Sequence, residues 1–137
     1  VLVGARVVPK PGAASTIGVT SRILAAFLGL GDFGALDTFI SYAMLGVVAD
    51  LTLWLLGGNA ENLVVAILVG IFGHMGKFLV KWLFGLATEA PLGFVAFGLL
   101  RSILGYVVFG ALGGLLGWLT LKALRRAGFF AYLAEKR

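Results

Sequence analysis

The sequence contains no cysteine, one histidine and six carboxylates among its 137 residues. Without cysteine there is no disulfide and no thiolate metal site, and one histidine with scattered carboxylates does not supply the three or four ligands that a zinc site needs. The common serine-hydrolase, zinc-protease and nucleotide-binding motifs are also missing. We therefore expect no enzyme activity, no metal and no cofactor. Any active transport must take its energy from another chain or from an ion gradient.

Charge is scarce as well. Charged residues make up 12% of the chain and hydrophobic residues 61%, and the mean hydropathy is +1.07. The apolar residues form four long stretches, roughly 13–31, 34–57, 61–87 and 92–124. A stretch of about 18 or more apolar residues can cross the hydrocarbon core as a helix. The sequence predicts one all-α domain over residues 1–137, an integral membrane helical bundle with about four transmembrane helices.

Most of the lysines and arginines lie outside the apolar stretches or at their ends. Arg6 and Lys10 precede the first stretch, and the basic residues at the other end of the chain are Lys122, Arg125, Arg126, Lys136 and Arg137. Cytoplasmic segments of membrane proteins carry an excess of lysine and arginine. We therefore expect both termini in the cytoplasm, in a multi-pass protein of the plasma membrane. We attribute the net charge of +5 to the orientation of the protein in the membrane, and nucleic acid is not an expected partner.

The third stretch carries titratable residues inside an apolar helix. His74, Lys77 and Lys81 are spaced i, i+3 and i+7, so a helix places them within about 60° of one another. A lysine near the centre of a membrane helix costs about 2.5–3.5 kcal/mol on insertion scales. This cost favours a face that looks into the bundle or into a water-filled cavity. Alternatively, Lys81 lies near the helix end and reaches the interface.

The fourth stretch contains Arg101, about nine residues or roughly 14 Å from its outer end, a depth similar to that of Lys77. Two cations at one depth repel unless an anion lies between them, so we expect an anionic ligand group; the alternative is an arginine bound to backbone carbonyls. Tyr42, Trp82 and Tyr106 can stack on a flat ligand, although aromatics near span ends are normally interfacial. The predicted substrate-binding residues are His74, Lys77, Lys81, Trp82, Arg101 and Tyr106.

Two further predictions concern structure. Arg22 and Asp50 are expected at comparable depths in neighbouring spans, which predicts a structural ion pair that fixes helix register. Glycine lets helices approach closely because it has no side chain. The predicted helix-packing face, within the bundle or toward a partner subunit, is formed by two overlapping G-x-x-x-G motifs: Gly110 with Gly114, and Gly113 with Gly117.

These features together resemble the S components of energy-coupling factor (ECF) vitamin transporters. The resemblance begins at the string Arg6-Val7-Val8-Pro9-Lys10-Pro11-Gly12-Ala13-Ala14, includes Asp50 and Arg101, and ends at the glycine-rich segment 110–117. It covers nearly the whole chain and is closest to the hydroxymethylpyrimidine/thiamine type. It implies that the four stretches correspond to helices three to six of a six-helix fold. The first two helices, one of which docks on the coupling subunit, are then missing from this sequence.

The resemblance also implies a function. It implies a membrane-embedded subunit that captures a vitamin or vitamin precursor, with the lipid bilayer, a transmembrane coupling subunit and two ATPase subunits as partners. Thiamine-type members carry carboxylates in the region where this chain has Gly18, Ala25 and Lys81, so the expected ligand carries a carboxylate or phosphate, or is flat and neutral. The alternatives are a truncated or non-transporting protein that assembles through glycine-rich faces, and a small ion-coupled carrier or channel.

Overall fold

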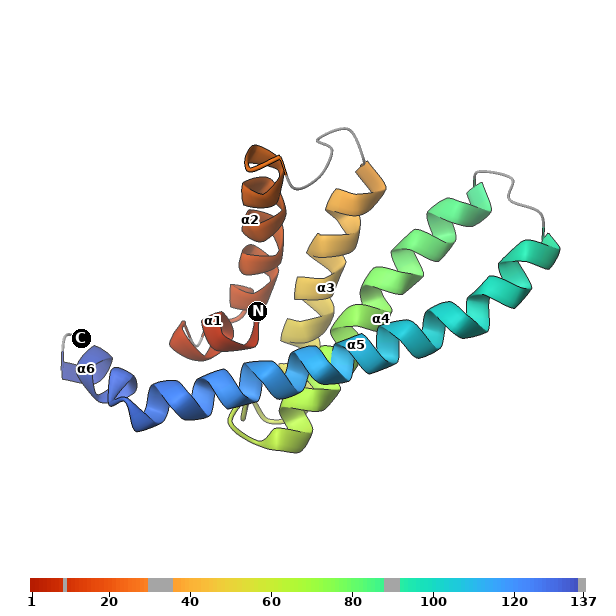
Figure 1. Ribbon diagram of the computed structural model, residues 1–137. Coiled ribbons are helices and arrows are strands. Elements are labelled where there is room, and N and C mark those ends of the chain that lie inside the picture. Colours follow the sequence, from red (N-terminus) through yellow and green to blue (C-terminus); the bar gives the residue numbers. More distant parts are fainter. Residues whose placement is uncertain (9, 30–35, 88–91, 136–137) are drawn as a thin grey trace.

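The computed structural model describes residues 1–8, 10–29, 36–87 and 92–135 (Figure 1). Its helices are α1 (Leu2–Val7), α2 (Ala13–Phe27), α3 (Leu36–Leu55), α4 (Leu63–Ala87), α5 (Leu92–Arg126) and α6 (Phe129–Glu135). No strand occurs in these residues, which confirms the predicted all-α class. Each of the four longer helices packs on the next in chain order, while α1 contacts both α2 and α5.

Three helices are long and apolar enough to cross a membrane. Their apolar segments are Thr38–Leu55 in α3, Leu63–Phe84 in α4 and Gly98–Arg126 in α5. Helix α2 is apolar but has 15 residues, about 22 Å in length, against a hydrocarbon core of about 30 Å. The fourth crossing therefore stays a prediction, and the end of its apolar stretch, residues 30–31, lies outside the described residues.

The start of α2 is capped by a residue of α3. The position before α2 is Gly12, which has no side chain to act as a cap. Asp50 instead accepts hydrogen bonds from the backbone N–H groups of Ala14 at 3.0 Å and Ser15 at 2.8 Å, and from the Ser15 hydroxyl at 2.6 Å. Ala14 is 0% exposed, so its N–H has no access to water. These hydrogen bonds connect α2 to α3. The negative charge of Asp50 at the N-terminus of α2 stabilises the contact further.

The structure thus gives Asp50 a different partner from the predicted one, Arg22. Arg22 is buried, but it lies on α2 about 10 Å beyond Ser15 and makes a separate contact. The prediction estimated the depths of Arg22 and Asp50 by counting residues from the ends of their spans. This count did not reveal that α2 begins at the level of Asp50. The carboxylate therefore meets the first turn of α2 and its free N–H groups.

Two helix crossings are made by glycine backbones. Between α4 and α5, a Cβ atom on Gly70 would collide with the carbonyl oxygen of Gly110 and would lie 2.8 Å from the nitrogen of Gly114. Between α2 and α3, a Cβ atom on Gly18 would lie 2.6 Å from the carbonyl oxygen of Tyr42. No side-chain rotation can relieve such contacts, because they are with backbone atoms. The helices therefore touch at their backbones.

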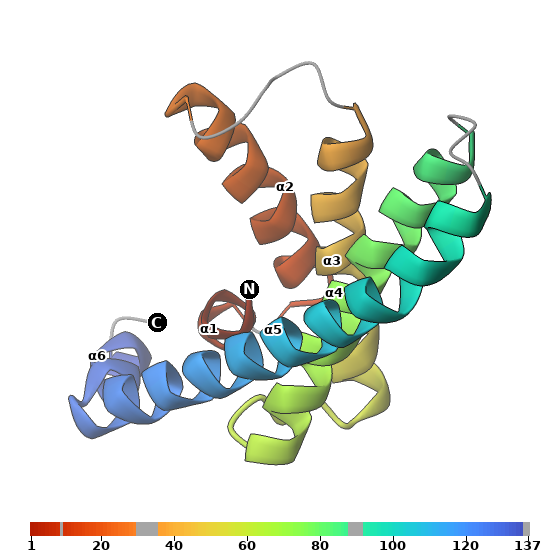
Figure 2. The same cartoon turned by 45° about the vertical axis from the view of Figure 1, so that its right-hand side comes forward.

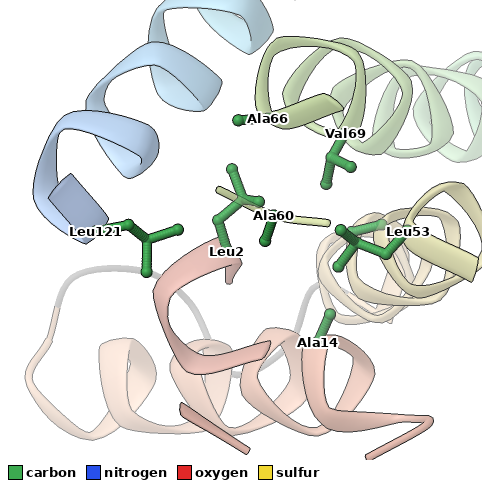
Figure 3. Close-up of a cluster of buried hydrophobic side chains, with 8 residues drawn as sticks. Leu2, Ala14, Leu53, Ala60, Ala66, Val69 and Leu121 are labelled. Atoms are coloured by element: carbon green, nitrogen blue, oxygen red, sulfur yellow. The ribbon is translucent and has the colours of Figure 1, made fainter. Parts of the chain in front are cut away.

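The short helix α1 carries the centre of a buried cluster. No helix is predicted before residue 13, because Pro9 and Pro11 interrupt this segment. The chain nevertheless forms α1, and Leu2 from this helix packs into the cluster shown in Figure 3. The cluster joins α1 to residues from α2, α3, α4, α5 and the α3–α4 connection: Ala14, Ala49, Leu53, Ala60, Ala66, Val69 and Leu121.

A single carboxylate, Glu61 in the α3–α4 connection, holds α1 in place. Its oxygens accept hydrogen bonds from Arg6 Nε and Arg125 Nη1, each at 2.9 Å. Its backbone carbonyl accepts a third from Trp118 Nε1 at 2.8 Å. We call this end of the molecule, formed by α1, the α3–α4 connection and the last turns of α5, the basic end.

Helix α5 is much longer than a bilayer is thick. It has 35 residues, or about 52 Å, and Figure 2 shows its last turns extending past the other long helices. It ends at Arg126, and Gly128, which has a φ of 73°, lets the chain turn into α6. Phe130 of α6 then packs against the buried cluster and stacks under Arg6, whose guanidinium carbon is 5.2 Å from the ring centre. Helix α6 thus closes back on α1.

Replacing Asp50 by alanine should lower the free energy of unfolding by about 2 kcal/mol, because it removes a helix cap and leaves buried N–H groups unpaired. Asp50→Asn, which keeps one acceptor oxygen, should cost less. Thr20→Ala is a matched control, since Thr20 is exposed and bonds only within its own helix. Thermal unfolding in detergent measures all three variants. Equal melting of Asp50→Ala and wild type would contradict the capping role.

Replacing Gly70 by alanine should destabilise the protein by about 1–3 kcal/mol, because the added methyl group separates α4 from α5. The control is Gly98→Ala on α5, where an added Cβ meets no atom within 4 Å. This control should be neutral or slightly stabilising, since alanine favours helix over glycine. The same unfolding measurement compares the two. If both variants melt alike, α4 and α5 are not in backbone contact at Gly70.

Candidate binding cavity

A partly open cavity of about 370 Å³ lies between α1, α2, α3, α4 and α5. Its polar side chains are Ser21 from α2, Tyr42 from α3, and His74 and Lys77 from α4. Much of the remaining lining is glycine: Gly18, Gly70, Gly73, Gly113, Gly114 and Gly117. A volume of this size falls within the range of small-molecule sites.

The two G-x-x-x-G motifs of α5 have different surroundings. Gly110 and Gly114 lie in the backbone contact with α4. An added Cβ on Gly113 would instead meet only the ring of His74, at an ordinary 3.9 Å, and one on Gly117 would meet the side chain of Leu2 at 3.1 Å. The second motif therefore borders the cavity and contributes space to it.

Lys77 is a partly buried cation that packs on an aromatic ring. Its ammonium nitrogen lies 4.1 Å from the centre of the Tyr42 ring. This cation–π contact offsets part of the cost of removing the charge from water. Lys77 makes no ion pair in the part of the chain that the structure describes, where Glu61 pairs with Arg6 and Arg125. The cavity thus contains a positive charge that an anionic group can neutralise.

The hydrogen bond made by His74 defines its chemistry. Nδ1 lies 3.1 Å from the carbonyl oxygen of Gly70 on the same helix. A carbonyl oxygen can only accept, so Nδ1 carries the proton. In the neutral ring, Nε2 is then left as an acceptor for a donor group on a ligand.

His74 also borders a second cavity, of about 390 Å³, next to residues 101–109 of α5. The other residues around it are Arg101, Ser102, Gly105, Tyr106 and Phe109. The Tyr106 ring packs on Phe78 with a centroid distance of 5.3 Å and an interplanar angle of 56°. Arg101 is exposed, and no hydrogen bond or ion pair joins it to another described residue.

The predicted binding residues therefore separate into groups. His74 and Lys77 line the central cavity, whereas Arg101 and Tyr106 line the second one, together with His74. The prediction that one anion lies between Lys77 and Arg101 is not supported, because the two cations border different cavities. Depth along a helix was estimated from the sequence, but the direction in which each side chain points depends on how α4 and α5 cross.

Lys81 and Trp82 line neither of these two cavities. Lys81 is exposed. This agrees with the alternative prediction, in which Lys81 lies near the helix end and its side chain reaches the membrane interface. The indole nitrogen of Trp82 is buried and has no hydrogen-bond partner within the described residues. Ser21 in the cavity wall was not predicted. The only indication of this position in the sequence is that Ser21 lies three residues after Gly18, which contacts α3.

Helix α1 forms one boundary of the central cavity. Leu2 and Val3 line it from the basic end, and Glu61 holds α1 there through Arg6. The cavity thus has polar groups at Lys77, His74 and Tyr42, and an apolar boundary at α1.

Helical folding and three helices long and apolar enough to span a membrane place this chain among helical membrane proteins. No protein-family model, no curated protein and no solved structure matches the chain.

Replacing Lys77 by methionine should raise the stability of the ligand-free protein by about 1 kcal/mol, because it removes an unpaired charge from the bundle and keeps a similar volume. Lys81→Met, at an exposed position on the same helix, should change stability little. Thermal unfolding in detergent without added ligand compares the two. A destabilised Lys77→Met variant would mean that Lys77 serves to stabilise the bundle through Tyr42.

Proposed function

We propose that this chain is a membrane-embedded binding subunit for a small molecule that carries an anionic group. The observation that carries the proposal is the position of Lys77 beside His74 and Tyr42 in a cavity of about 370 Å³, where this cation forms no ion pair with any described residue. A charge that only served insertion or folding would be replaced by an apolar residue at a gain in stability. Keeping the charge of Lys77 has a function when an anionic ligand provides the opposite charge.

The lining groups narrow the class of ligand. The Lys77 ammonium binds a carboxylate or phosphate, His74 Nε2 accepts a hydrogen bond from a ligand N–H or O–H, and the glycine surfaces allow a flat ring to lie close to the backbone. A vitamin or vitamin precursor with an acidic group has these features. Thiamine, a cation, does not suit Lys77.

We further propose that the chain acts as the S component of an ECF-type ABC transporter. In this proposal four helices cross the plasma membrane with both termini in the cytoplasm, and a transmembrane coupling subunit with two ATPase subunits supplies the energy. The support is the resemblance of the segment 6–14 and of the positions Asp50 and Arg101. The basic residues Arg6, Lys122 and Arg125 near the two ends of the chain agree with a cytoplasmic basic end.

A non-transporting scaffold that assembles through glycine faces is the weaker proposal. Gly110 and Gly114 are occupied in the contact with α4, and Gly113 and Gly117 border the cavity or α1. Of the four, only Gly113 is exposed, so the glycines do not form one continuous free face for a partner subunit.

The test is thermal unfolding of the purified protein against a panel of vitamins and precursors. A ligand at 100 times its dissociation constant should stabilise the folded protein by about 2.7 kcal/mol. The stabilisation should disappear in Lys77→Met and persist in Lys81→Met. Gly113→Val should also remove it, because the added side chain enters the cavity while leaving the α4–α5 contact intact.

Two results would contradict the proposal. One is a folded protein that no compound of the panel stabilises. The other is a compound that stabilises wild type and Lys77→Met equally, since its site must then lie elsewhere.

A further inference from the structure

The last turns of α5 carry three cations on neighbouring positions of one face. Lys122, Arg125 and Arg126 are related by i, i+3 and i+4 spacing. Like charges at these spacings destabilise a helix. Within the described residues only Arg125 has a carboxylate partner, Glu61 at 2.9 Å. The helix end therefore holds more positive charge than the described carboxylates neutralise.

Two of these cations, Lys122 and Arg125, border a small cavity. Its volume is about 160 Å³, and it is lined by Glu61, Trp118, Leu121, Lys122 and Arg125. The Lys122 ammonium lies 4.7 Å from the centre of the Trp118 ring. Arg125 uses only Nη1 for its bond to Glu61, and its side chain is 73% exposed, so its other N–H donors are available.

Glu61 does not make this cavity negative. Its two oxygens are already bound by the guanidinium groups of Arg6 and Arg125. With Lys122 beside them, the cluster of one carboxylate and three cations has a net charge of about +2 at neutral pH. An incoming anion therefore meets an attractive site.

The site lies where α5 leaves the apolar part of its length. The segment long and apolar enough to cross a membrane ends at Arg126, and Trp118 lies two turns earlier. The following helix α6 adds aromatic side chains, among them the exposed Tyr132. Tryptophan, tyrosine and basic residues at one level are typical of the membrane–water interface.

We propose that Lys122, Arg125 and Arg126 bind the phosphate of an anionic glycerophospholipid, with Trp118 beside the headgroup. Ammonium and guanidinium donors bind phosphate oxygens by charge-assisted hydrogen bonds. The acyl chains run along an exposed apolar part of α5, formed by Leu112, Leu116 and Leu119. A free phosphate ion shares the headgroup chemistry but gains nothing from these leucines.

The experiment uses the whole chain in detergent micelles doped with phosphatidylglycerol, with phosphatidylcholine or with inorganic phosphate. Native mass spectrometry counts retained lipids, and thermal unfolding reports their effect on stability. We expect one phosphatidylglycerol to be retained in preference to phosphatidylcholine, and the melting temperature to rise only with phosphatidylglycerol.

Two single variants, Lys122→Gln and Arg126→Gln, test the site without touching the Glu61 bonds. Each should weaken phosphatidylglycerol binding about five-fold, the effect of one cation near an anionic lipid surface. Lys81→Gln, an exposed lysine at the other end of the membrane helices, is the control and should bind as wild type does. Equal retention of both lipids, unchanged binding by both variants, or an equal effect of inorganic phosphate would each overturn the proposal.

Discussion

The hydrogen bonds from the first turn of α2 to Asp50 are the contact on which much of the rest depends. Helix α2 has no side-chain cap of its own, and its first N–H groups are buried. The carboxylate of α3 satisfies them and fixes how far α2 slides along α3. In this register Gly18 meets the backbone of Tyr42, and Ser21 reaches the cavity. If Asp50 released α2, the cavity would lose one wall.

The glycines of α5 show how one short sequence serves two purposes. Shifting a motif by three residues rotates it by about 60° around a helix. Gly110 and Gly114 therefore lie in the contact with α4, and Gly113 and Gly117 lie just beside it. The first pair brings the helices together, and the second leaves unfilled space next to the crossing. The cavity and the close contact between α4 and α5 thus both depend on the glycines of α5.

Sequence reasoning predicted the helical class and about four membrane-spanning helices from the long apolar runs, and three of the four are long and apolar enough to span a membrane. It placed His74 and Lys77 on one face, and both line the same cavity. It missed Asp50 as a cap, since the capped turn lies 35 residues away. It also missed α1, which is short and depends on contacts with distant helices. The separation of Lys77 from Arg101 needed the crossing geometry of α4 and α5, which periodicity within one helix does not contain.

The two ends of the cavity are held by different forces. Its walls are held by glycine backbones in contact and by the hydrogen bonds from the first turn of α2 to Asp50. Its boundary at α1 is held through Arg6 and Glu61, whose side chains are 41% and 28% exposed. At physiological ionic strength, charges in water are screened over about 8 Å. Salt therefore weakens the ion pair at the α1 boundary more than it weakens the glycine contacts of the walls, and the buried Leu2 still holds α1 when the ion pair is screened.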